Sequence, residues 1–74
     1  MSRKFDLIEA RKQFFSVRDM LHIMGQTKQI GEKEIDDLVD GAYMNLTEVE
    51  QLLVTKLKSC GVDVEELYEI WRKR

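Results

Sequence analysis

Apolar residues in the middle of the chain recur at the spacing of an α-helix. From residue 31 to residue 60 they follow one another in steps of 4, 3, 4, 3, 4, 4 and 3, at Ile35, Val39, Ala42, Leu46, Val49, Leu53, Leu57 and Cys60. Because a helix has about 3.6 residues per turn, this spacing keeps them all on one face. The pattern predicts one long central helix over about 31–60, covered by the rest of the chain.

Two features favour a break in this helix as an alternative. Gly41 lies in its interior, where glycine costs about 1 kcal/mol relative to alanine. Thr47 and Glu50 have the spacing of a capping box, which begins a new helix. A turn near Asn45 gives no reason for the apolar stripe to continue in register beyond it. We therefore expect one helix and keep a four-helix chain, broken near Asn45, as the alternative.

The flanking segments are also amphipathic. The first predicts a helix over about 3–24, capped by Ser2 and ended by Gly25, with apolar residues at Leu7, Ala10, Phe14, Val17, Leu21 and Met24. The last predicts a short helix over about 63–73, where Asp63 and Glu66 form a second capping box. The expected fold is all-α, with one domain over 1–74 and the outer helices folded back along the central one. If the central stripe is longer than these covers, the remainder is expected to bind a second chain.

Composition limits how such a chain can be stabilised. It has 74 residues, 43% of them hydrophobic, and a single core of this size usually gives roughly 3–5 kcal/mol. One cysteine excludes an internal disulfide, and one histidine with one cysteine gives no set of zinc ligands. Good helix packing or self-association remains as the source of stability, and we expect a homodimer.

Charge and hydropathy narrow the class of partner. The net charge of −2 disfavours nucleic-acid binding, although the basic ends, with Tyr68 and Trp71 close to the C-terminal one, keep it as an alternative. No apolar run approaches the roughly 18 residues of a membrane span, and the N-terminus lacks the apolar region of a signal peptide. The expected location is cytoplasmic, without membrane contact.

The titratable residues do not form a recognisable reaction centre. The acidic residues from Glu32 to Asp40 suit the start of a helix and lack the glycine and spacing of a calcium loop. His22 has no nucleophile or metal ligand placed beside it, and Cys60 is expected to be a buried small residue. We therefore expect no catalytic, cofactor-binding or metal-binding residues, and no enzymatic activity.

Part of the chain resembles a known family. The small sporulation-control phosphatases, which act on response-regulator aspartyl phosphate, are antiparallel helical hairpins with an I-E-x-x-R start and an S-Q-E-L-D signature. The segments 8–11 (I-E-A-R) and 35–39 (I-D-D-L-V) are similar to these motifs at a comparable separation. The signature serine and glutamine correspond to Glu32 and Lys33, the arginine lies one place early, and 62–74 has no counterpart. The resemblance implies a phosphatase-like modulator as an alternative function, without assigning the chain to the family.

Surplus apolar side chains give the favoured prediction of function. The first helix carries more of them than one seam can bury, and methionine and phenylalanine suit an adaptable partner groove. The expected partner-binding residues are Phe5, Phe14, Phe15, Met20, Ile23, Met24, Tyr68 and Trp71. We expect a small non-enzymatic regulatory or adaptor protein that binds another protein through its helices, of the kind that bacteria and phages encode as regulators or inhibitors.

Overall fold

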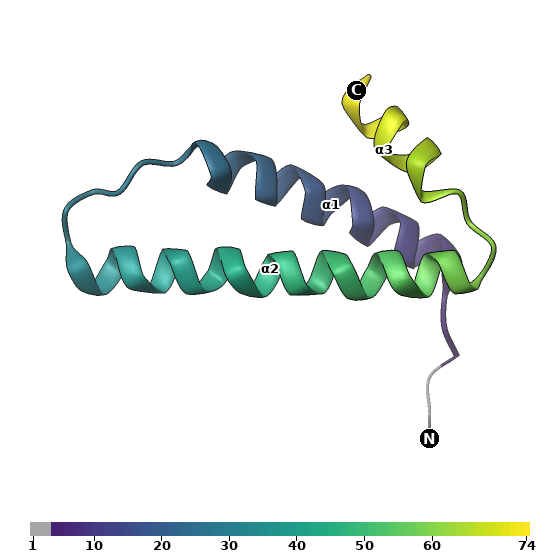
Figure 1. The fold of residues 1–74 in the computed structure, drawn as a ribbon, viewed down its shortest axis with the longest axis horizontal. Coiled ribbons are helices and arrows are strands. Elements are labelled where there is room, and N and C mark those ends of the chain that lie inside the picture. The colour runs from purple at the N-terminus through teal and green to yellow at the C-terminus, as the bar shows by residue number, and fades with distance from the viewer. Residues whose placement is uncertain (1–3) are drawn as a thin grey trace.

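A computed structural model describes residues 4–74 of the chain, which fold into three α-helices (Figure 1). The first helix, α1, spans Leu7–Gln26; the long central helix, α2, spans Lys33–Ser59; and the short helix α3 spans Val64–Arg72. The predicted all-α fold with a long central helix is confirmed. The four-helix alternative is wrong, because α2 continues without interruption through Asn45.

Near Asn45, where the alternative placed a break, the Thr47 side chain bonds within the helix. The Thr47 hydroxyl donates a hydrogen bond to the Tyr43 carbonyl oxygen at 3.0 Å, one turn earlier, and does not cap a new helix. Acidic residues in the first turn of α2 and lysines in its last turn suit the helix dipole. Gly41 therefore lies within one continuous helix of 27 residues, despite the low helix propensity of glycine.

Aspartate side chains cap the starts of α1 and α3. The helix α1 begins at Leu7 because Asp6 accepts a hydrogen bond from the Glu9 amide at 3.0 Å, so the predicted start near residue 3 was too early. The predicted cap at Ser2 lies outside the described residues. Gly25 does not end α1, which continues to Gln26. At α3 the Asp63 carboxylate accepts from the Glu66 amide at 3.2 Å, as predicted.

The helices α1 and α2 form an antiparallel hairpin whose arms diverge. Figure 1 shows them close together where α1 begins and α2 ends, and well apart at the connecting loop, while α3 folds back over the close end. The buried apolar cluster lies at that close end, and its members are Ala10, Phe14, Leu57, Val64 and Leu67. Val17 and Leu21 are buried further along α1.

The central stripe is covered only in part, contrary to the sequence prediction. Leu57 is the one residue of α2 classed as buried, whereas Ile35 is 47% exposed and Val39 is 37% exposed. Cys60, predicted to be buried, is exposed. Divergence of the helix axes explains the first difference. Cys60 is the C-cap residue of α2, next to the turn at Gly61, where the chain leaves the packed face.

The molecule is flat. Its principal extents are 43 × 37 × 15 Å, and the shortest is little more than the roughly 10–12 Å diameter of one helix with its side chains. A single layer of helices leaves both flat faces of the hairpin without a covering element. Apolar residues on those faces are therefore exposed.

Candidate protein-binding surface

The diverging arms of the hairpin enclose an apolar cleft at its open end. This cleft has a volume of about 290 Å³ and lies between the end of α1, the connecting loop and the first half of α2. Its apolar lining comes from Met24, Ile30, Ile35, Val39 and Tyr43. Four of these side chains, all except Met24, are between 37% and 68% exposed. The cleft is open to solvent and large enough for a few apolar side chains of a partner.

The Asp36 carboxylate holds the loop that closes the cleft. Its two oxygens accept hydrogen bonds from the backbone amides of Ile30 and Gly31, both at 3.0 Å. Gly31 has a φ of 91°, a left-handed conformation that glycine adopts without strain. The loop enters α2 through this turn, and Ile30 is 68% exposed beside the cleft.

The polar rim of the cleft is mixed in charge. Lys28 lies on the loop, and Asp36 and Asp40 lie on α2. Asp36 is already engaged with the loop amides, so Asp40 is the carboxylate for which no hydrogen bond or ion pair is found within residues 4–74. An exposed acidic residue at the rim favours a basic group on the occupant.

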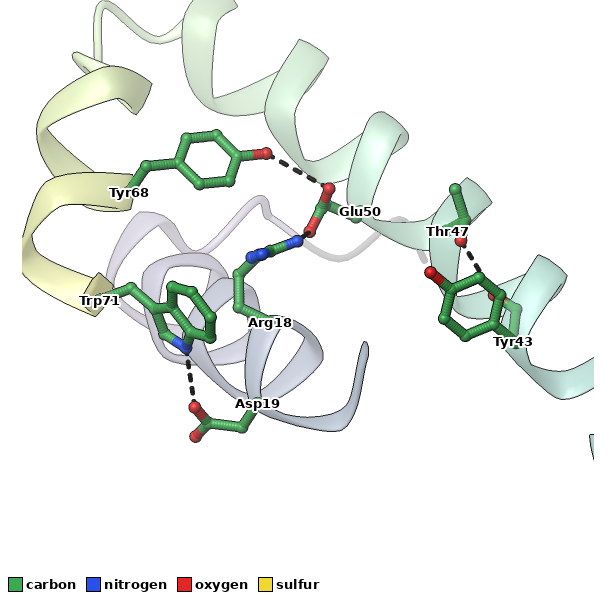
Figure 2. Close-up of polar contacts among 7 residues, drawn as sticks. All are labelled: Arg18, Asp19, Tyr43, Thr47, Glu50, Tyr68 and Trp71. Atoms are coloured by element: carbon green, nitrogen blue, oxygen red, sulfur yellow. Dashed lines mark hydrogen bonds and ion pairs between the residues drawn. The ribbon is translucent and has the colours of Figure 1, made fainter. Parts of the chain in front are cut away.

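A polar network joins all three helices at the other end of the hairpin (Figure 2). Arg18 of α1 forms an ion pair of 2.8 Å with Glu50 of α2, and the two side chains are only 24% and 14% exposed. The guanidinium carbon of Arg18 lies 4.6 Å from the centre of the Trp71 ring and 5.4 Å from that of Tyr68. The indole Nε1 of Trp71 donates to Asp19 at 2.8 Å.

Tyr68 completes this network and has a perturbed acidity. Its hydroxyl donates to the second Glu50 oxygen at 3.3 Å. Burial of the phenol and the negative charge of Glu50 raise the pKa of Tyr68 above its usual 10.0. The Nε of Arg18 is buried without a hydrogen-bond partner, but the charge of the guanidinium is matched by Glu50. We interpret these contacts as the ones that hold α3 against the hairpin.

The predicted partner-binding residues do not form one surface. Phe14 is fully buried, and Phe15 packs against the core, with its ring 5.7 Å from that of Phe14. Tyr68 and Trp71 belong to the polar network. The remaining four lie on α1 or just before it: Phe5, Met20 and Ile23 are exposed, and Met24 lines the cleft.

Sequence reasoning missed the cleft residues on α2 and the loop. Ile35 and Val39 belong to the central stripe, which was expected to be covered, and Ile30 lies on the loop beside them. The signal that points to them is length. The stripe continues over 27 residues of α2, whereas α1 has 20 residues and diverges from it. Where the apolar stripe of α2 extends beyond the helix that packs on it, its remaining residues are exposed.

No group of three or more His, Cys, Asp or Glu side chains within 4–74 is placed to hold a metal ion. The His22 ring packs edge-on against Trp71, with 5.6 Å between ring centres. No helix in that range is long and apolar enough to cross a membrane.

No protein-family model matches this chain, and neither a curated protein nor a solved structure was found to match it.

Proposed function

We propose that this chain is a non-enzymatic helical adaptor or regulator that binds a protein partner in the cleft between α1 and α2. The observation that carries the proposal is the group of half-exposed apolar side chains at the open end of the hairpin. An apolar concavity with few polar groups is the usual form of a protein site that receives apolar side chains.

The occupant that fits this cleft is an amphipathic helix with a basic flank. Two diverging helices form a groove in which a third helix can insert apolar residues at a spacing of three or four. The apolar floor, formed by Ile35, Val39 and Tyr43, lies on one face of α2. Asp40 at the rim can pair with a lysine or arginine of such a helix.

A pair of charge variants tests the proposal. Val39→Lys places an ammonium in the cleft, where it must be desolvated by an apolar partner. Met44→Lys is the matched control, because Met44 is 70% exposed on α2 and does not line the cleft. We expect partners captured from a lysate of the source cell to be lost with Val39→Lys and retained with Met44→Lys, as measured by quantitative mass spectrometry. Equal recovery by the two variants would reject the cleft as the binding site.

The two alternative functions from the sequence are not favoured by a particular contact. A phosphatase-like role would depend on Asp36, whose carboxylate oxygens accept hydrogen bonds from the loop amides. Nucleic-acid binding would depend on the basic ends. There Arg72 pairs with Glu69, and the guanidinium carbon of Arg74 lies 5.0 Å from the centre of the Phe15 ring. We therefore propose protein binding alone.

A further inference from the structure

A second apolar stripe runs along α2, beside the one that faces the core. Leu38, Ala42, Asn45, Val49 and Leu52 follow one another in steps of 4, 3, 4 and 3. These steps are the a and d positions of a coiled-coil heptad, here with one asparagine at the middle. Leu38 is 70% exposed, Leu52 65% and Val49 41%, so the fold of a single chain leaves this seam uncovered.

The seam shares Ala42 and Val49 with the central stripe, but its centre points away from the polar network and from most of the cleft. At about 100° per residue, its centre lies roughly a third of a turn from Glu50, which binds Tyr68 of α3. Val39 and Tyr43 of the cleft lie at a similar angle from the seam centre, whereas Ile35, which also lines the cleft, is only about 60° from it. Figure 1 shows α1 and α3 on one side of α2 only.

The single chain exposes more surface than its mass requires. Its accessible area is 6069 Å², whereas a compact monomer of 8.8 kDa would have about 4,800 Å². Its radius of gyration is 14.5 Å, against about 11 Å for a compact chain of this length. The surplus of about 1,300 Å² exceeds the roughly 800 Å² that each partner contributes to a stable interface. There is enough uncovered surface for a dimer.

Charges at the two ends of the seam specify the orientation of a second copy. Glu34 and Lys56 lie on the seam side of α2, near its start and its end, and both are exposed. Lys56 also stands over the Phe5 ring at 5.0 Å. In an antiparallel pair the acidic start of one α2 meets the lysine of the other, whereas a parallel pair would place like charges together.

We infer that two copies of this chain associate through antiparallel packing of their α2 seams about a twofold axis near residues 43–45. Leu38 of one copy then lies opposite Val49 of the other, and Ala42 lies opposite Asn45. The small alanine leaves room for the amide, and a buried asparagine fixes the register at a cost in stability. In this register Leu52 of one copy lies opposite Ile35 of the other, so the interface reaches the edge of the cleft and leaves Val39 and Tyr43 outside it.

Sedimentation equilibrium of the full chain tests the inference. We expect twice the chain mass of 8.8 kDa at about 100 μM. The double variant Leu38→Glu/Leu52→Glu should weaken self-association by about 30-fold or more, because dimerisation would then bury the introduced carboxylates at the seam. Met44→Glu is the control, because that exposed residue lies outside the seam. Asn45→Leu should tighten the dimer without endangering the fold.

Mixed disulfides test the orientation. In a Cys60→Ser background, chains carrying Leu38→Cys should form a disulfide with chains carrying Val49→Cys, and little with themselves. Homodisulfides alone would indicate parallel packing and overturn the inference. A wild-type chain that stays at 8.8 kDa, or a dimer unaffected by the Leu38 and Leu52 changes, would also overturn it. Because Val39 lies off the seam, Val39→Lys should leave the dimer intact, which separates this inference from the proposed partner site.

Discussion

At the scale of single residues, three aspartates act on the backbone. Asp6 and Asp63 cap helices, and Asp36 reaches back to two loop amides at the entrance to α2. The density of carboxylates between Glu32 and Asp40 is therefore explained in part by loop geometry. The side of the cleft that the loop forms depends on this one carboxylate.

Replacing Asp36 should loosen the loop. We expect Asp36→Asn to lower the free energy of unfolding by about 1 kcal/mol, because two charge-assisted hydrogen bonds are weakened at a partly exposed site. Urea denaturation measures the change, and amide hydrogen exchange at Ile30 and Gly31 should accelerate. Asp37→Asn is the control, since Asp37 makes only an exposed pair with Lys33. Equal losses in the two variants would contradict the role assigned to Asp36.

Tyr68 should make stability depend on pH in the alkaline range. Because the folded protein raises the pKa of Tyr68 above 10.0, the folded state holds the proton more tightly than the unfolded state does. Its contribution to stability is therefore complete below pH 10 and is lost as the pH rises through the folded pKa. We expect the difference in unfolding free energy between wild type and Tyr68→Phe to shrink above pH 10. A difference independent of pH would refute this assignment.

At the scale of elements, the register of the apolar residues predicted α2 better than the local breakers did. Gly41 and the capping-box pattern at Thr47 both favoured a break, yet the helix continues because its tertiary contacts and terminal charges favour one rod. In contrast, Gly31 and Gly61 adopt positive φ and turn the chain at the two ends of α2. The same residue type therefore has opposite consequences at different positions.

Alanine substitutions distinguish these glycines. A Cβ at Gly41 would meet no atom within 4 Å, so Gly41→Ala should stabilise the protein by about 0.5–1 kcal/mol through helix propensity. Gly31→Ala should destabilise it by about 1 kcal/mol or more, because alanine is strained at a φ of 91°. Thermal unfolding followed by circular dichroism would show midpoints shifted in opposite directions. A lower midpoint for Gly41→Ala would mean that α2 is strained at this residue.

The sequence predicted the elements but not how far one covers another. Apolar periodicity placed the packed positions Ala10 and Leu57. It does not contain the angle between helix axes, which decides whether Val39 is covered or lines a cleft. Phe14, which lies on the predicted apolar face of the first helix and was also named as a partner contact, is in the core.

At the scale of the whole molecule, a flat layer of three helices has a packed end and an open end. The packed end contains the core and the Arg18 network, which lock α3 in place. The open end contains the cleft, and a flank of α2 carries the exposed seam. This division explains how a chain of 74 residues can have a defined core and still present apolar surface to other chains.

The most direct test of the proposed cleft is photo-crosslinking at two adjacent residues of α2. Benzoylphenylalanine in place of Tyr43 would lie in the cleft, and the same group in place of Met44 would lie outside it. After irradiation in the source cell, we predict a covalent adduct with another protein at position 43 and none at position 44. Equal adducts at both positions, no adduct at either, or only a second copy of this chain at position 43 would contradict the account.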